Sequence, residues 1–369
     1  MAVGAGSVEG LDLNSRPLGA DLAGKRVFLT GHTGFKGSWM TALLKRLGCD
    51  VYGYALSPKG EPNLFELASL RELLAGETIA DIRDSSQLAE SLRIAQPALV
   101  IHMAAQAFVR RSYAEPADTW GVNVMGTVNL LEAARTVPGI AGVVVVTTDK
   151  CYENRGWEWG YRENDPLGGH DPYSASKAAA ELVAQSYRRS FFPSGETLVA
   201  TARAGNVIGG GDWSEDRLVA DAAKAAAGAY TLSVRNPGAT RPWQHVLDCL
   251  GGYLTLASAL LARDETAATA FNFGPGIGDN VSVSDFLTRL QPHWPELNWA
   301  VDAEAPRSAL HEASYLYLDS ARARKQLLWR PVWSLDKALA MTATWYRGVQ
   351  SDASCAESML NNQIEEFVS

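Results

Sequence analysis

Short apolar runs alternate with longer amphipathic stretches over most of the chain. The apolar runs cover residues 25–30, 50–56, 78–82, 98–103, 143–146, 198–203 and 271–274. The amphipathic stretches between them include 38–47, 85–95, 117–135 and 173–189. Short β-branched runs are typical of buried parallel strands, and the stretches between them are typical of crossover helices. The pattern therefore predicts an α/β fold with a Rossmann-type, doubly wound parallel sheet.

A glycine-rich loop separates the first predicted strand from the first predicted helix. It contains Gly31, Gly34 and Gly37, with Phe35 before the last glycine, in the spacing G-x-x-G-x-x-G. Glycines let the backbone approach a pyrophosphate, and a helix N-terminus offers free N–H groups. We therefore predict a dinucleotide-binding turn. His32 and Lys36 lie inside this loop, and whether they contact a phosphate or ribose or are only solvated stays open.

The second strand does not decide between NAD and NADP. It ends at Leu56 and is followed by Ser57-Pro58-Lys59, so the acid that usually binds a ribose 2′-hydroxyl is missing. Asp81, after the third strand, is a candidate for an adenine contact. Ala104, Ala105 and Gln106 follow the fourth strand, and small residues there let the backbone come close to a cofactor.

The stretches around the fifth strand carry the strongest candidate chemistry. Thr147-Thr148-Asp149-Lys150 ends the strand, and such ends face the ligand crevice of an open α/β sheet. Tyr173 and Lys177 are four residues apart, so one helix face carries both. The ammonium of Lys177 should favour the phenolate of Tyr173, which predicts a base that works near neutral pH.

Arginines recur where the strand–helix alternation becomes irregular. Their planar guanidinium groups suit a diphosphate, although each one singly fits a surface ion pair equally well. The candidates for substrate binding are Arg110 in a loop at 109–113, together with Asn206, Arg217, Arg235, Arg241 and Arg307. We expect four segments: a flexible tail at 1–22, a Rossmann domain at 23–205 plus about 240–274, a substrate domain at about 206–239 plus 275–348, and a tail at 349–369.

Composition and charge exclude several classes of protein. The net charge of −8 and the lack of a long basic run argue against nucleic-acid binding. No apolar stretch is long enough to span a membrane, and the N-terminus is not a signal peptide. The four scattered cysteines lack metal-ligand spacing, so we expect no metal and a reducing cytoplasm.

Several motifs together resemble a known family. GHTGFKG, HMAAQ, TTDK, YSASK and RPWQHV are similar to those of the extended short-chain dehydrogenases/reductases, between residues 25 and 346. Thr148-Asp149-Lys150 narrows the resemblance to the sugar-nucleotide dehydratases. The stretches at 151–165 and 202–213, with RPWQHV, resemble the CDP-glucose 4,6-dehydratase branch.

The resemblance implies a reaction and a role for each motif. NAD would be the cofactor, and CDP-glucose would be converted to CDP-4-keto-6-deoxyglucose by C4 oxidation, loss of water across C5 and C6, and hydride return to C6. Tyr173 would be the base at the 4-hydroxyl, Thr148 would bind that hydroxyl and Asp149 would protonate the 6-hydroxyl. The glycines would bind the pyrophosphate, Asp81 and Ile82 the adenine, and Arg241 the diphosphate.

One position departs from the better-known dTDP-glucose dehydratases. They carry Asp-Glu where this chain has Asp149-Lys150, and their glutamate removes the C5 proton. Lys150 can replace it only when neutral, which burial or a neighbouring cation would favour. The alternative is that Lys150 orients water or substrate while another group takes the proton.

Two other functions share the fold and the cofactor. A sugar-nucleotide 4-epimerase needs no acid–base pair for C5 and C6, so Asp149-Lys150 argues against it. A non-catalytic NAD-binding regulatory protein can lose Tyr173 or Lys177, and this chain keeps both. The helices at 117–135 and 173–189 could pair across a two-fold axis, which favours a homodimer or homotetramer.

Overall fold

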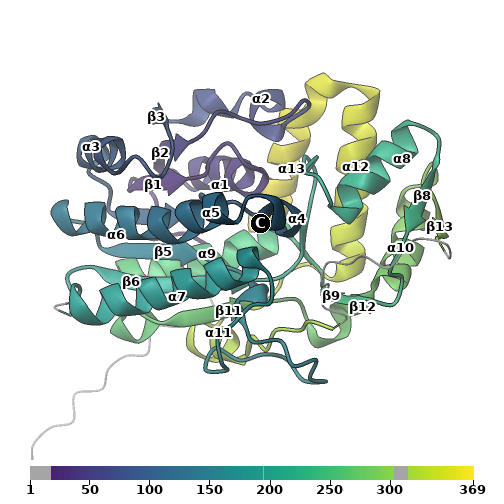
Figure 1. Cartoon of the computed structure of the whole chain (residues 1–369). Coiled ribbons are helices and arrows are strands. Elements are labelled where there is room, and N and C mark those ends of the chain that lie inside the picture. The colour runs from purple at the N-terminus through teal and green to yellow at the C-terminus, as the bar shows by residue number, and fades with distance from the viewer. Residues whose placement is uncertain (1–17, 194, 303–314) are drawn as a thin grey trace, which may run out of the picture.

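A seven-stranded parallel sheet forms the centre of the molecule (Figure 1). The computed structural model describes residues 18–193, 195–302 and 315–369. The strand order is β11-β6-β5-β4-β1-β2-β3, so the order reverses between β1 and β4. The strands are β1 (Arg26–Thr30), β2 (Asp50–Ala55), β3 (Gly76–Ile79), β4 (Leu99–His102), β5 (Gly142–Val146), β6 (Leu198–Ala204) and β11 (Ala270–Phe273). The predicted doubly wound sheet is confirmed, and its switch point places a ligand crevice beside β1 and β4.

Helices cover both faces of the sheet, because alternate residues of each strand point to opposite sides. Val144 and Val146 of β5 pack in one core with α1 (Phe35–Arg46) and α9 (Val246–Leu261). Val143 and Val145 pack in the other core. The helices of that second core are α3 (Ser85–Ala95), α6 (Gly126–Thr136) and α7 (Pro172–Ser190). β5 is therefore buried on both faces, and its carboxyl end is held rigidly.

Smaller elements gather at one end of the sheet, on the right of Figure 1. They comprise α8 (Leu218–Ala227), α10 (Val283–Leu290) and the strands β8 (Thr231–Val234), β9 (Thr240–Pro242), β12 (Asn280–Ser282) and β13 (Asn298–Val301). β9 pairs with β12 and β8 pairs with β13, while β7 (Val207–Ile208) pairs with β10 (Gln244–His245). The remaining helices are α2 (Leu64–Leu67), α4 (Val109–Ala114), α5 (Pro116–Trp120), α11 (Ala321–Gln326) and α12 (Leu335–Ser351). The division of the chain into two domains stays a prediction.

Both predicted tails contain ordered parts. The segment from 356 onward forms α13 (Ala356–Val368), which packs beside α12 and α1. Its buried Leu360, Ile364 and Phe367 recur at helical spacing, so the interpretation of 349–369 as a tail is wrong. At the other end, Leu22 is fully buried in the core with α1, and residues 1–17 lie outside the described part.

Two further stretches differ from expectation. Residues 109–113, predicted as a loop, lie in α4. The predicted helix at 117–135 is divided into α5 and α6 by a π turn over Gly121–Met125. In the described ranges no helix is long and apolar enough to cross a membrane. All four cysteines are free, and a location in the cytoplasm stays a prediction.

Candidate active site

Two residues after the carboxyl end of β5, the chain makes a single 3₁₀ turn over Asp149–Cys151. Thr148 caps this turn: its hydroxyl accepts a hydrogen bond from Lys150 N at 3.3 Å and donates one to Asp149 Oδ1 at 3.0 Å. Because β5 is buried on both faces, it holds the backbone of Thr148, Asp149 and Lys150 in a fixed position. Thr148 and Asp149 are buried, and Lys150 is half-buried.

Asp149 has a carboxyl oxygen that finds no protein partner. Oδ2 is buried and accepts no hydrogen bond from any described residue. A Cβ added to Gly205, in the glycine-dense stretch after β6, would lie 3.0 Å from this oxygen. Burial raises the pKa of Asp149, although the cations of Lys150 and Arg241 oppose this effect. The carboxyl group therefore keeps its proton to a higher pH than an exposed aspartate does, which favours a role as proton donor.

The same environment that raises the pKa of Asp149 lowers the pKa of Lys150. Burial lowers its pKa, and the cations Arg241 and Arg217 lower it further, against the carboxylates of Asp149 and Asp171. A lysine in such surroundings can be neutral and act as a base. A buried carboxyl with a raised pKa thus lies next to an amine with a lowered pKa.

Tyr173 and Lys177 lie on the face of α7 that turns toward β5. Asp171 caps the helix by accepting hydrogen bonds from Ser174 N at 2.9 Å and Ser174 Oγ at 2.6 Å. Lys177 Nζ donates to the carbonyl of Val146 at 3.0 Å. The helix cap and this bond therefore hold the tyrosine and the lysine next to the end of β5.

The pKa of Tyr173 is not lowered as the sequence predicted. Burial, with the charges of Asp149 and Asp171, raises it to about 12, against a hydrogen bond with Thr148 and the charge of Arg217. Burial and the neighbouring charge of Lys36 lower the pKa of Lys177 to about 8. The lysine charge that was expected to favour the phenolate is itself weakened by desolvation, and the charges of the chain leave Tyr173 protonated at neutral pH.

The glycine-rich loop has the shape of a phosphate cradle. Gly31 adopts φ +78°, and an added Cβ would lie 2.8 Å from Ala104 N. A Cβ on Gly37 would lie 2.0 Å from Gly31 O, so only glycine permits this packing of α1 against the loop. A Cβ on Gly34 would meet Gly31 O at 3.5 Å, an ordinary contact distance. Gly34 precedes α1, whose first turn carries no acid and whose N-cap makes no side-chain bond.

Two other residues of this loop turn toward the protein interior. His32 is buried, and its ring Nε2 lies 3.0 Å from Glu77 Oε1 on β3. Burial lowers the pKa of His32 to about 4, so the ring is neutral. Lys36 Nζ donates to Tyr253 Oη at 3.4 Å on α9. Both side chains therefore bind protein groups, while Phe35 packs against the core of α1 and α9.

The predicted adenine position and the predicted cofactor-contacting segment after β4 lie on either side of β1 in the strand order. Asp81 accepts hydrogen bonds from Arg83 at 2.6 Å (Nη2) and 2.9 Å (backbone N), next to buried Ile82. On the other side, Ala104 N donates to Thr30 Oγ1 at 3.1 Å, and Ala105 and Gln106 follow it. Residues 104–106 follow β4 at the switch point, whereas Asp81 follows β3, and the cofactor contacts of both positions stay predictions.

Asn123 has a role that the sequence left undecided. It lies in the π turn between α5 and α6, and its Oδ1 accepts from Gln106 N at 2.9 Å. Its Nδ2 donates to Ser176 Oγ at 2.8 Å. Asn123 thus links the segment after β4 to α7, and π turns often occur at functional sites.

The predicted substrate residues are not all in one place. Arg241 is buried in β9, and Arg217 precedes α8 with its guanidinium 5.9 Å from the Phe108 ring. Both cations act on Lys150. Arg110 forms an ion pair with Asp216 at 3.0 Å, next to a cavity of about 350 Å³.

The other two described candidates differ in exposure. The Asn206 carbonyl accepts from Gln244 N at 3.1 Å, which ties this residue to β10. Arg235 is exposed beyond β8. Arg307 lies outside the described residues.

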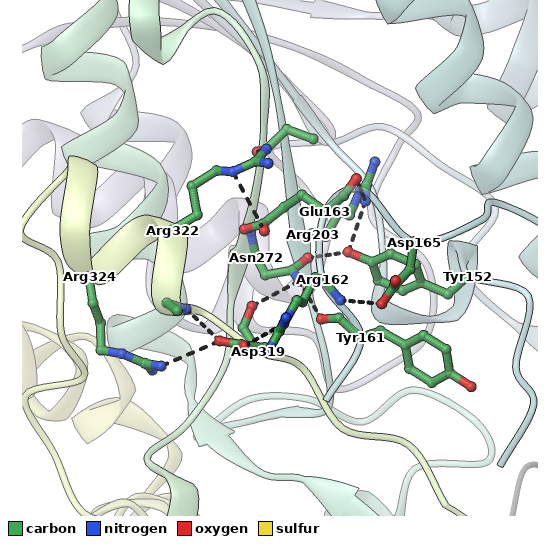
Figure 2. A network of polar contacts seen from close by, with 12 residues as sticks. Tyr152, Tyr161, Arg162, Glu163, Asp165, Arg203, Asn272, Asp319, Arg322 and Arg324 are labelled. Atoms are coloured by element: carbon green, nitrogen blue, oxygen red, sulfur yellow. Dashed lines mark hydrogen bonds and ion pairs between the residues drawn. The ribbon is translucent and has the colours of Figure 1, made fainter. Parts of the chain in front are cut away.

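The aromatic insertion at 151–172 is anchored by a buried polar network (Figure 2). Arg203 Nη1 on β6 donates to Tyr152 Oη at 2.8 Å, and that phenol donates to Asn272 Oδ1 at 2.6 Å. Asn272 N donates to Glu163 Oε1 at 2.9 Å. Tyr161 stacks on Tyr152 with ring centroids 5.3 Å apart. The insertion is therefore a fixed part of the site, and the sequence pattern did not reveal Arg203 as its anchor.

Comparison with known proteins shows the family to which the chain belongs. The GDP-mannose 4,6-dehydratase family model matches residues 28–342. The chain belongs to this family. A CDP-glucose 4,6-dehydratase from Salmonella typhimurium is 46% identical over 330 residues, which cover 88% of this chain and 91% of that protein. The family is one of sugar-nucleotide dehydratases, so the predicted resemblance is confirmed.

Solved structures support the same assignment at the level of the fold. The dTDP-glucose 4,6-dehydratase from Streptomyces venezuelae, solved with NAD bound, has a TM-score of 0.71 and 25% identity, covering 88% of this chain and 98% of that one. An epimerase from Methanothermobacter thermautotrophicus has a TM-score of 0.78 and 22% identity, covering 91% and 96%. The second likeness shows the fold alone.

Proposed function

We propose that the protein is a CDP-glucose 4,6-dehydratase that forms CDP-4-keto-6-deoxy-D-glucose. The observation that carries the proposal is the buried Asp149 with its unpartnered Oδ2, next to Lys150, at the end of β5. An acid and a base side by side are what elimination of water requires. An epimerase has no use for this pair, and the 46% identity to the Salmonella enzyme supports the CDP-glucose substrate.

The residues of the glycine-rich loop fit NAD. The tight turn at Gly31, the close packing at Gly37 and the uncapped N-terminus of α1 suit a pyrophosphate. The Streptomyces relative holds NAD, which supports this cofactor although β2 lacks the usual acid. When bound, NAD⁺ would accept the hydride from C4, return it to C6, and add a positive charge to the site.

Tyr173 and Thr148 prepare the sugar for oxidation at C4. Thr148 binds the 4-hydroxyl, and Tyr173 takes its proton as the C4 hydride leaves. Because burial and the charges of Asp149 and Asp171 hold the pKa of Tyr173 near 12, the phenolate requires nearby positive charge. In the chain, the hydrogen bond with Thr148 and the charge of Arg217 lower this pKa. The ammonium of Lys177, on the same helix face, would favour the phenolate further, although the pKa of the lysine is itself lowered.

Lys150 and Asp149 carry out the elimination. The 4-ketone acidifies the adjacent C5–H, and the neutral amine of Lys150 removes that proton. Asp149 donates its proton to the leaving 6-hydroxyl, which departs as water. When C6 regains a hydride, the proton held by Lys150 returns to C5. Arg241 and Arg217 bind the diphosphate, and their cations also lower the pKa of Lys150, so substrate binding and base strength depend on the same residues.

A product assay tests the function directly. The purified protein is incubated with NAD⁺ and CDP-, dTDP-, GDP- or UDP-glucose, and the alkali-induced absorbance of a 4-keto sugar is followed. We expect signal with CDP-glucose. Signal with another nucleotide sugar alone would keep the elimination chemistry and reject the CDP assignment. A product with inverted C4 and no 4-keto sugar would identify an epimerase.

We also propose that two chains or more associate through the paired helices α5–α6 and α7. These helices lie side by side on one face of the sheet and expose Trp120, Met125 and Leu182, which are 40%, 51% and 54% accessible. Burying such side chains in a homodimer or homotetramer would remove apolar surface from water.

Sedimentation of a charged variant tests this interface. Met125→Lys should shift the protein toward the monomer mass, because a buried unpaired ammonium is costly at an apolar interface. Val332→Lys is the matched control, since Val332 is also exposed, at 64%, and lies outside these helices. A monomeric parent protein, or equal masses for the two variants, would contradict the proposal.

A further inference from the structure

A third polar residue lies on the catalytic face of α7. Glu181 follows Lys177 by four residues and Tyr173 by eight, so all three lie along one side of the helix. Its side chain is 3% exposed. No step of the proposed reaction uses this carboxylate. Because a buried charge is costly unless paired, its partners indicate what it does.

Glu181 binds three groups from two neighbouring strands. Oε1 accepts a hydrogen bond from the hydroxyl of Thr147, the residue directly after β5. Oε2 accepts from Thr201 Oγ1 at 2.7 Å and from Arg203 Nη2 at 2.8 Å, both on β6. Burial alone would raise the pKa of Glu181, but Arg203 and the hydroxyl donors lower it, so the carboxylate is ionised.

The bond to Thr147 acts at the point where the catalytic turn begins. Thr147 N donates to the Ala202 carbonyl at 2.9 Å, which keeps this residue in the sheet. Successive side chains of an extended chain point to opposite sides. The Thr147 hydroxyl accordingly binds Glu181, while the next side chain, Thr148, binds Asp149 at 3.0 Å. Glu181 thus touches the residue before the catalytic turn and none of the reacting groups.

We propose that Glu181 is a positioning residue, which fixes the end of β5 against the catalytic face of α7 through Thr147. Two connections then define the relative placement of Tyr173 and Asp149: the Thr147–Glu181 bond and the Lys177–Val146 bond of 3.0 Å. This inference deepens the proposed function and rests on it. A shift of the turn by a fraction of an ångström would misplace the acid and base relative to the sugar.

The negative charge of Glu181 also supports the catalytic face of α7, because it acts on the pKa of Lys177. Lys177 is surrounded by Lys36 of α1, Cys151 after β5, and Glu181 on its own helix. Burial and Lys36 lower the pKa of Lys177, whereas Glu181 raises it. The carboxylate therefore helps the lysine to keep its proton. Arg203 and the donors Thr147 and Thr201 in turn keep Glu181 ionised.

A matched pair of threonine variants tests the inference without leaving Arg203 as an unpaired buried cation. Thr147→Val and Thr201→Val each remove one hydroxyl bond to Glu181 and keep the side-chain shape. We expect Thr147→Val to lower kcat about tenfold, with KM within about twofold of the parent, because the turn is misplaced while the diphosphate site is intact. Thr201→Val should leave kcat within about twofold, because Arg203 still binds Oε2 of Glu181 and the bond from Thr147 to Oε1 is kept.

Rescue and stability measurements separate positioning from general loosening. Thr147→Ser restores the hydroxyl and should recover kcat, and the melting temperatures of the two valine variants should fall by similar amounts. Equal losses of kcat in the two valine variants, or no loss in Thr147→Val, would overturn the inference. The threonine variants are compared with whichever nucleotide sugar the parent protein accepts. If that sugar is not CDP-glucose, the proposed substrate is rejected, but the test of Glu181 can still be carried out.

Discussion

Asp149→Asn is expected to lower dehydratase turnover on the order of 10²–10⁴-fold, since a placed general acid contributes about that factor. The amide keeps the size of the side chain and its hydrogen bond with Thr148, but it has no proton to give to the leaving 6-hydroxyl. The unpartnered Oδ2 points to this role, because a buried carboxyl oxygen that no described residue satisfies is available to the substrate. The measurement is the rate of 4-keto sugar formation from CDP-glucose.

The variant should stop the reaction after removal of the C5 proton. In deuterated water, CDP-glucose recovered from the Asp149→Asn reaction should carry deuterium at C5, because Lys150 still exchanges that proton while the hydroxyl cannot leave. Ser214→Ala, in the loop after Asp212, is a control variant that leaves Asp149 in place. Full turnover by Asp149→Asn, or loss of both elimination and exchange with an intact fold, would reject the assignment of Asp149 as the acid.

The pH dependence of turnover offers a second check on Asp149. Burial raises its pKa above the ordinary value, so the carboxyl keeps its proton to a higher pH than an exposed aspartate. Activity that needs the protonated form is present below that raised pKa and is lost as the pH rises through it. We expect this alkaline loss to be absent from the residual activity of Asp149→Asn.

The sequence was sufficient for the parts of the site that depend on local pattern. The β-branched run 143–146 identified a strand buried on both faces, and the i, i+4 spacing placed Tyr173 beside Lys177 on one helix face. Both features follow from the periodicity of strands and helices. The resemblance of Thr148-Asp149-Lys150 to a dehydratase motif then indicated the chemistry. The family match confirmed the dehydratase family, and the roles of the three residues stay predictions.

Features that depend on burial or on distant partners could not be predicted in this way. The charge of Lys177 suggested a lowered pKa for Tyr173, but the depth of the site raises that pKa, and depth is not visible in a four-residue spacing. Glu181 has no motif, because its partners Thr147 and Arg203 come from two different strands. The sequence of α13 is amphipathic, but its pattern does not show which surface its apolar face covers. The structure shows that this face packs against α1 and α12.

Lys150→Met is expected to abolish elimination and C5 exchange together, with a loss of turnover again on the order of 10²–10⁴-fold. The base is removed in this variant, whereas oxidation at C4 keeps Tyr173, Lys177 and Thr148. Transient absorbance of a reduced nicotinamide should therefore appear with CDP-glucose and no 4-keto-6-deoxy product. This outcome differs from that of Asp149→Asn, in which C5 exchange survives.

Lys150→Arg decides between the two roles that Lys150 could have. A guanidinium keeps the positive charge and much of the length, but it cannot be deprotonated in a protein, so it cannot be a base. If Lys150 removes the C5 proton, the arginine variant should be as inactive as the methionine variant. In the parent protein, activity should rise with pH as Lys150 loses its proton, and burial, Arg241 and Arg217 lower the pKa of this step. The arginine variant should not show this rise. Substantial turnover by Lys150→Arg would show instead that the cation orients substrate or water, and that another group takes the C5 proton.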